Sequence, residues 1–142
     1  MIYLLDTNAC IAYLNDRNST VARRLATVQP RDVFVCQIVK AELYYGAHKS
    51  SRREQNLALL KRFFGQFASL SFNDQATESY GRIRTALAVR GTPIGPNDLI
   101  IAAIAVAHNA TLVTHNAREF SRVPGLQVED WSLDEPLPST TA

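Results

Sequence analysis

The sequence is poor in several features that mark particular classes of protein. Its two cysteines, Cys10 and Cys36, lie in apolar surroundings and form no closely spaced metal-binding pair, so we expect reduced thiols in the core of a cytosolic protein. The longest apolar run, from Leu99 to Ala107, is far shorter than the roughly 20 residues that a membrane-spanning helix needs. The short apolar segment at the N-terminus follows no basic region and is interrupted by Asp6, which is unlike a signal peptide. We therefore expect a cytoplasmic protein that does not bind a membrane.

An excess of one charge is also missing. The chain has 15 lysines and arginines against 13 aspartates and glutamates, and this net charge of +2 does not by itself indicate a nucleic-acid-binding protein. The three histidines, His48, His108 and His115, are not spaced as a zinc-binding set, and we expect none of them to bind metal. The chain of 142 residues, 46% of them hydrophobic, shows no repeat or low-complexity block within its folded part. This composition predicts one compact domain over residues 1–132, followed by a loose tail over 133–142.

Short apolar segments alternate with segments of helical periodicity. The apolar runs predict buried parallel strands at residues 2–5, 33–36 and 111–114, an edge strand at 70–72 and a last strand at 127–131. The periodicity predicts helices directly after Asp6, from residue 19 or 20 to Pro30, and over 38–48, 52–67, 73–89 and 97–108. This alternation argues for an α/β sandwich around a small parallel sheet. In such folds, ligands bind beyond the carboxyl ends of the strands.

Four acidic residues stand where apolar structure gives way to polar loops or to helix starts: Asp6, Glu42, Asp98 and Glu119. An ionised carboxylate at the edge of a core is costly unless something compensates its charge. Two carboxylates about 4 Å apart repel each other by roughly 4 kcal/mol at an effective dielectric constant of 20. If the fold brings these acids together, the simplest compensation is a divalent cation with oxygen ligands, which can activate water and bind phosphate.

Each acid alone also has a simpler explanation. Asp6 suits the cap of the helix that follows it, and Asp98 suits the positive N-terminal end of its own helix. Glu42 is harder to explain, because we place it on the helical face that also carries Tyr45. Glu119 lies in a polar loop, where an exposed glutamate is ordinary.

Polar residues near the predicted strand ends are open to two interpretations. Thr7, Asn8 and Thr114 are suited to orienting metal ligands or a bound water, but they are also typical of turns and helix caps. Asn116 competes with Glu119 as the oxygen donor nearest the end of the late strand.

The order of these residues carries more information than any one of them. An aspartate after the first strand is followed by a glutamate on a middle helix, an aspartate that begins a buried late helix, and then Thr-x-Asn-x-x-Glu-Phe. This pattern resembles the PIN-domain ribonucleases, and within them the VapC toxins of bacterial toxin–antitoxin pairs. The stretches that carry the resemblance are MIYLLDTNACIAYL, VKAELYYGA and GTPIGPNDLIIAAIAVAHNATLVTHNAREFSRVPGLQVEDW. The resemblance extends over about residues 1–132, and its last stretch is similar to the VapC branch that cuts initiator transfer RNA.

The resemblance implies a PIN-like three-layer α/β/α sandwich, with Asp6, Glu42 and Asp98 as an acidic metal-binding core. PIN domains often have an aspartate at the turn after the late strand. This chain has Asn116 there, so Asn116 and Glu119 both stay candidates to complete the catalytic site. The implied activity is hydrolysis of RNA by water with one or two Mg²⁺ or Mn²⁺ ions, in the anticodon region of initiator tRNA, leaving a 5′-phosphate and a 3′-hydroxyl.

The same resemblance implies partners. VapC toxins pair with a VapB antitoxin, and they commonly form homodimers and toxin–antitoxin hetero-oligomers. The helix expected over 52–67 has more apolar residues than one core stripe requires. Four of them either are covered inside the domain or form a groove for the antitoxin: Leu60, Phe63, Phe64 and Phe67. Two basic clusters either contact RNA phosphates or form solvated helix faces: Arg52, Arg53, Lys61 and Arg62, and Arg82, Arg84 and Arg90.

Other functions fit the sequence less well. A phosphatase that uses Asp6 as its nucleophile would need a second aspartate where Asn8 stands. A receiver domain would need a late lysine, which the chain lacks. A PIN-like RNA-binding protein without catalysis is a further alternative, and metal-dependent cleavage of RNA would distinguish it.

Overall fold

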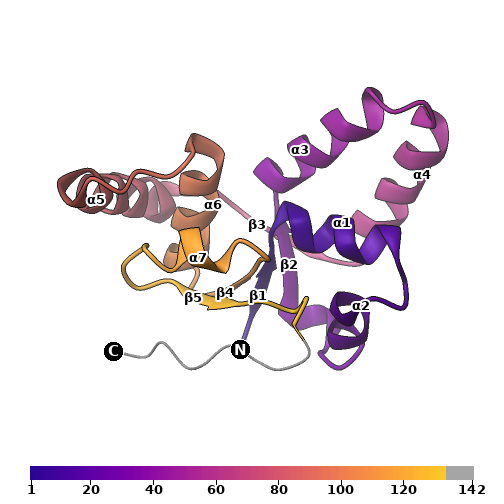
Figure 1. The fold of residues 1–142 in the computed structure, drawn as a ribbon, viewed down its shortest axis with the longest axis horizontal. Helices are drawn as coiled ribbons and strands as arrows, with labels where there is room; N and C mark the ends of the chain where they lie inside the picture. The colour runs from indigo at the N-terminus through magenta and orange to yellow at the C-terminus, as the bar shows by residue number, and fades with distance from the viewer. Residues whose placement is uncertain (134–142) are drawn as a thin grey trace.

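The computed structural model describes residues 1–133, which fold around one parallel β-sheet (Figure 1). The five strands lie in the order β3-β2-β1-β4-β5. Their bounds are Tyr3–Leu5 for β1, Val33–Cys36 for β2, Ala68–Leu70 for β3, Thr111–Val113 for β4 and Gln127–Glu129 for β5. Every pairing is parallel, so the carboxyl ends of all five strands lie along the same edge of the sheet.

Helices cover the sheet on two sides, with α1 to α4 to the right of it and α5 to α7 to the left in Figure 1. Their bounds are Thr7–Asn15 for α1, Thr20–Leu25 for α2, Gln37–His48 for α3, Arg53–Phe64 for α4, Asp74–Arg90 for α5, Pro96–Ala107 for α6 and Ala117–Phe120 for α7. A turn of 3-10 helix, Pro30–Asp32, precedes β2. The predicted α/β/α sandwich around a small parallel sheet is confirmed. Within residues 1–133, none of the helices has both the length and the apolar character needed to cross a membrane.

Strand β1 occupies the point where the order of connections reverses. It lies between β2, which follows it directly in the chain, and β4, which comes much later. The register pairs Leu5 of β1 with Val113 of β4, so the next residues, Asp6 and Thr114, emerge side by side. The Asp6 amide donates a hydrogen bond to the Val113 carbonyl oxygen at 2.9 Å. Open α/β sheets bind ligands at such switch points.

Helix α6 is the buried helix that the long apolar run predicted. The side chains that it buries are Leu99, Ile101, Ala102, Ala103, Ile104 and Ala105. Gly95 and Pro96 begin the helix, and the fixed backbone of proline suits a first helical position. Its first turn carries Asp98. The preceding helix, α5, ends as predicted at Gly91, whose φ of 70° lies in the left-handed region that favours glycine.

Several boundaries differ from those predicted. Helix α4 ends at Phe64, because the chain turns at Gly65, and this places β3 at Ala68–Leu70 instead of 70–72. Helix α2 ends at Leu25, well before Pro30. Helix α7 was not predicted, since a single helical turn is too short to show periodicity. Apart from Leu133, the predicted loose tail lies outside the described residues.

Candidate active site

Asp6 is the most buried of the four acids, with 4% of its surface exposed. It follows β1 and caps α1: its Oδ1 accepts a hydrogen bond from the Thr7 amide at 2.8 Å. Its Oδ2 accepts hydrogen bonds from Thr114 Oγ1 at 2.8 Å and from Asn8 Nδ2 at 3.4 Å. Burial raises the pKa of Asp6, and the hydrogen bonds from Thr114 and Thr7 oppose that rise. The cap therefore holds this carboxylate in place at the edge of the sheet where ligands are expected.

Glu42 reaches the same region from α3, but not for the reason we gave. The residues of α3 that enter the core are Val39, Leu43 and Ala47. Tyr45 is 67% exposed, so the predicted apolar face was wrong. Glu42 is half-buried, and its Oε1 accepts a hydrogen bond from Thr7 Oγ1 at 3.2 Å. Thr7 thus connects this glutamate to the cap formed by Asp6.

The pKa of Asp98 responds to burial and to the charges of the other three acids. Burial is the main cause that raises the pKa of Asp98 to about 6. The other causes are the negative charges of Asp6, Glu119 and Glu42, in that order. Each of these three charges acts on Asp98 through space. The fold therefore places Asp6, Glu42 and Glu119 within electrostatic range of Asp98.

Glu119 and Asn116, which we treated as competitors, are hydrogen-bonded to each other. Asn116 Nδ2 donates to Glu119 Oε2 at 2.7 Å. The backbone amide of Asn116 donates to Thr114 Oγ1 at 3.0 Å. Asn116 therefore fixes the glutamate against the turn that follows β4.

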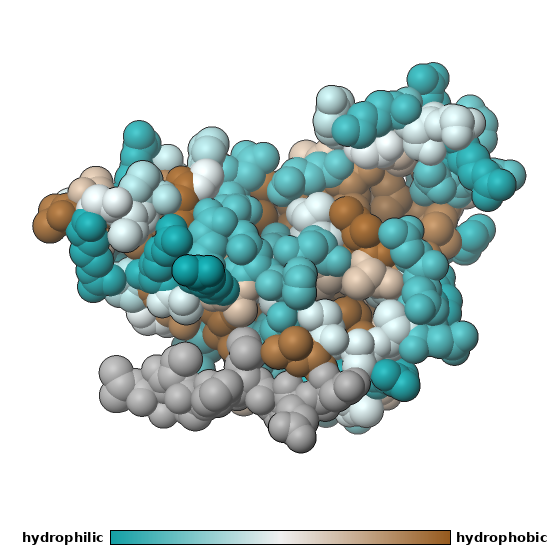
Figure 2. All heavy atoms as spheres, viewed as in Figure 1, coloured by the Kyte–Doolittle hydropathy of each residue, from teal (hydrophilic) through white to brown (hydrophobic). Residues whose placement is uncertain are grey.

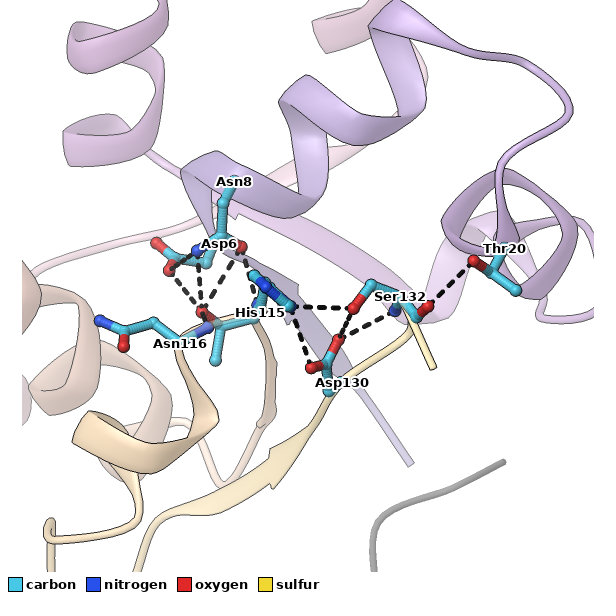
Figure 3. A network of polar contacts seen from close by, with 8 residues as sticks. Asp6, Asn8, Thr20, His115, Asn116, Asp130 and Ser132 are labelled. Carbon is cyan, nitrogen blue, oxygen red and sulfur yellow. Dashed lines mark hydrogen bonds and ion pairs between the residues drawn. The ribbon is translucent and has the colours of Figure 1, made fainter. Parts of the chain in front are cut away.

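Thr114 is the centre of this hydrogen-bond network, and Figure 3 labels its partners Asp6, Asn8 and Asn116. The residue is 1% exposed, and its hydroxyl donates to Asp6 while accepting from Asn116 and, at 3.2 Å, from Asn8 Nδ2. Asn8 Oδ1 accepts in turn from the backbone amide of His115 at 2.9 Å. Two segments more than a hundred positions apart in the sequence are thereby held together at the site.

The acids have no basic partners in the described part of the chain. None of the ion pairs within residues 1–133 includes any of the four. In the same range, no three side chains of His, Cys, Asp or Glu lie close enough together to hold a metal ion. Asp98 is therefore repelled by the other three acids, but the four do not form a closed set of ligands. Side-chain rotation can bring carboxylates on neighbouring elements together, and their oxygens are ligands that Mg²⁺ and Mn²⁺ accept. The donor set fits a divalent cation, which would offset the repulsion that raises the pKa of Asp98.

The residues predicted to bind an antitoxin are separated by the fold. Leu60, Phe63 and Phe64 lie in the core, with Phe63 only 1% exposed, which favours the alternative that they are covered inside the domain. Phe67 is half-buried and lines a pocket of about 380 Å³ together with Tyr13 and seven further residues. Figure 2 shows hydrophobic side chains gathered in the hollow between α1 and the arm formed by α3 and α4. The seven basic residues of the two predicted clusters are all exposed.

A second polar network adjoins the site and was missed in the sequence. His115 Nδ1 lies 3.2 Å from Asp130 Oδ2 and 2.9 Å from Ser132 Oγ (Figure 3). We assigned no role to Asp130 or Ser132. No local pattern marks them, because they meet His115 only when β5 pairs with β4.

Comparison with known proteins identifies the family. The sequence profile of the PIN domain matches residues 3–126. A Ribonuclease VapC2 from Rickettsia felis is 42% identical over 132 residues, which cover 92% of this chain and 98% of the relative. The chain belongs to the PIN-domain family, among the VapC ribonucleases. A relative named tRNA(fMet)-specific endonuclease VapC, from Salmonella typhimurium, is 39% identical over 129 residues, or 91% of this chain and 97% of its own.

Solved structures show the same fold. VapBC2 from Rickettsia felis, bound to a DNA fragment from its promoter, matches with a TM-score of 0.84 and 41% identity over 92% of this chain and 99% of that one. DNA-bound VapBC from Salmonella typhimurium matches with a TM-score of 0.86 and 38% identity, over 92% and 98% of the two chains. PIN-domain nucleases generally use divalent metal ions, in agreement with the all-oxygen donor set found here.

Proposed function

We propose that this protein is an endoribonuclease that depends on Mg²⁺ or Mn²⁺ and serves as the toxin of a VapBC toxin–antitoxin pair. The observation that carries the proposal is that the negative charges of Asp6, Glu119 and Glu42 all act on Asp98. None of the four acids has a basic partner among residues 1–133, and Asp6 stands at the switch point of the sheet. An uncompensated cluster of this kind is costly in a protein that does not use it. The relatives named as ribonucleases support the choice of RNA as the substrate.

Asp6, Glu42 and Asp98 are the residues proposed to hold the metal. When bound, a divalent cation supplies positive charge that lowers the pKa of water and stabilises charge that develops on phosphate. The chain's own part is positioning. Thr7 bonds both Asp6 and Glu42, and Thr114 bonds Asp6, so these carboxylates are oriented before any substrate arrives.

The proposed reaction is hydrolysis by in-line attack. Oxygen of a water molecule forms the new bond to phosphorus, and the bond from phosphorus to the 3′-oxygen breaks. One carboxylate of the acidic set accepts the water's proton, and the departing 3′-oxygen takes a proton from solvent, so the products are a 5′-phosphate and a 3′-hydroxyl. No side-chain nucleophile is required. Asn8, engaged with Asp6 and Thr114, occupies the position that an aspartyl phosphatase would need for its second aspartate.

The target and partner follow from the relatives. We propose cleavage of initiator tRNA in its anticodon region, because a relative at 39% identity is named for tRNA(fMet). We propose a VapB antitoxin as the partner, because the matching structures are VapBC complexes. The apolar pocket that includes Tyr13 and Phe67 is the surface proposed for it. We also propose homodimers, and a cytoplasmic site of action, where tRNA is found.

The test is incubation of the purified protein with total RNA, with Mg²⁺ or with EDTA, followed by sequencing of the new 5′ ends. We expect Mg²⁺-dependent ends concentrated in one or a few tRNAs, and none with Asp98→Asn. RNA binding without cleavage would instead indicate the catalytically inactive alternative. Full cleavage by a folded Asp98→Asn protein would contradict the assignment of the site.

A further inference from the structure

A small pocket adjoins the acidic site, between α1, α2 and the carboxyl ends of β4 and β5. Its volume is about 210 Å³. Asn8 and Thr114 line this pocket and also bond Asp6, so the pocket and the acidic site share a wall. The volume is below the roughly 300–1,000 Å³ of pockets for drug-sized ligands. It therefore suits one planar ring system and is too small for a whole nucleotide.

The lining of the pocket combines an apolar wall with polar side chains. Its apolar wall is formed by Ala9, Ala12, Val21, Val113 and Trp131. One polar part is the network of His115, Asp130 and Ser132, and the other is the wall of Asn8 and Thr114 that the pocket shares with the acidic site. An unstacked nucleobase has the complementary character, because its faces are apolar and its edges form hydrogen bonds.

The network fixes the orientation of the His115 ring. The amide and the hydroxyl of Ser132 both donate to Asp130 Oδ1, so the hydroxyl proton of Ser132 is already committed. Ser132 Oγ and Asp130 Oδ2 therefore both accept from His115 Nδ1, and the network assigns the proton to that nitrogen. This is no nucleophilic triad, because there the acid and the serine contact opposite ring nitrogens.

The other nitrogen of the ring is available. His115 Nε2 has no hydrogen-bond partner within residues 1–133, and the side chain is 72% exposed. Asp130, by contrast, is 5% exposed and its oxygens are occupied by Ser132 and His115. The fold thus holds one histidine rigidly at the edge of an apolar pocket, with one ring nitrogen left to meet a ligand.

We propose that this pocket receives one unstacked base of the RNA, next to the phosphate that is cut, and that His115 Nε2 contacts the edge of that base. The inference rests on the proposed function and adds to it a means of selecting the cleavage position. Asn8 and Thr114, which belong to both places, set the distance between base and phosphate. Asp130 and Ser132 are positioning residues that act through His115.

The test combines variants of the protein with variants of the RNA. A short RNA hairpin that the protein binds is prepared with each nucleotide of its loop replaced in turn by an abasic one. Ala12→Met fills the pocket from α1, and Ala58→Met is the matched control on the exposed surface of α4. Two quantities are measured for each combination of a protein variant with an RNA variant. They are kcat/KM of cleavage with Mg²⁺, and affinity for the RNA in EDTA by fluorescence anisotropy.

For the wild type and for Ala58→Met, we expect removal of one particular base to lower both quantities by about tenfold or more. Ala12→Met should lower both quantities by about the same factor with intact RNA, because the base no longer fits the pocket. Removal of that base from the RNA should then lower neither quantity further. His115→Ala should likewise lose no more with the abasic RNA than with intact RNA. This second variant tests the pocket if Ala12→Met does not fold. Equal losses on intact and abasic RNA, or tolerance of every abasic position, would overturn the proposal.

The two proposals fail differently in this experiment. Cleavage without coupling between pocket and base would reject the pocket and leave the ribonuclease in place. Coupling in the affinity, without any Mg²⁺-dependent cleavage, would retain the pocket as an RNA-binding site and reject the proposed catalysis. Absence of both would reject both.

Discussion

Replacement of Asp98 by asparagine should make the protein more stable at neutral pH when no divalent cation is present. Burial and three neighbouring carboxylates raise the pKa of Asp98 to about 6, from an ordinary value of 3.8. A rise of that size corresponds to about 3 kcal/mol in a site shielded from water. Asp98 is only partly buried, and solvent screening reduces the figure to about 1 kcal/mol. Asparagine keeps the shape of the side chain and removes the charge that is repelled.

The pH dependence has a definite sign. The pKa of Asp98 is higher in the folded protein than in the unfolded chain, so the folded state binds this proton more tightly. The stability that protonation contributes is complete below about pH 4 and is lost as the pH rises through about 6. Wild type and Asp98→Asn should therefore have more similar stabilities at about pH 4, and the variant should be more stable by about 1 kcal/mol above about pH 7.

Urea denaturation in EDTA across this pH range measures the effect. The matched control is Asp74→Asn, because Asp74 also lies in the first turn of a helix but is exposed. Both variants lose the favourable interaction of a carboxylate with a helix N-terminus, and only Asp98→Asn relieves repulsion. Added Mg²⁺ should stabilise the wild type, through binding to the folded state, more than it stabilises Asp98→Asn. If Asp98→Asn is destabilised at neutral pH as Asp74→Asn is, the acids do not repel one another and the reasoning is refuted.

Three further predictions concern other parts of the molecule. Thr114→Val removes the hydroxyl that bonds Asp6, and should lower the free energy of unfolding by about 1–3 kcal/mol in a thermal melt. RNA cleavage should fall by about tenfold or more, since the carboxylate loses its orientation, and unchanged cleavage would show that this bond does not matter. Phe63→Ala opens a cavity in the core and should cost about 3–5 kcal/mol by urea denaturation; weaker antitoxin binding at full stability would instead place the ring at an interface. Burial raises the pKa of the Cys10 and Cys36 thiols, so a thiol reagent should modify them only after denaturation, and rapid modification of the native protein would contradict their burial.

The parts of the fold that sequence analysis located correctly are those that local patterns describe. The apolar runs marked β1, β2, β4 and the buried helix α6, because a segment buried on all sides must be apolar throughout. The errors lie where tertiary packing decides. Helix α3 turns Tyr45 outward and buries a different face, and α4 gives way at Gly65 to a strand whose register is set by β2.

The candidate site also has features that the sequence could indicate and features that it could not. Asp6, Glu42 and Asp98 were singled out as acids beside apolar structure, and their role in holding metal stays a prediction. The helical face assigned to Glu42 was wrong, because α3 buries Val39, Leu43 and Ala47 instead. The partnership of Asn116 with Glu119 was not recognisable, since it depends on the side-chain geometry of a short helix. The contact of His115 with Asp130 also could not be predicted from the sequence, because the two residues follow different strands.

The sequence by itself determined that this chain forms an α/β domain and that a few acids stand at its strand ends and helix starts. Burial of apolar segments and helix capping depend on residues close together in the chain, and such patterns can be seen without a structure. Only the tertiary structure decided that three acids from other elements repel Asp98, and that a histidine is held by hydrogen bonds at a small pocket beside Asn8 and Thr114. Charge repulsion and hydrogen bonding act across space, and parallel pairing of β1, β4 and β5 is what creates the distances over which they act.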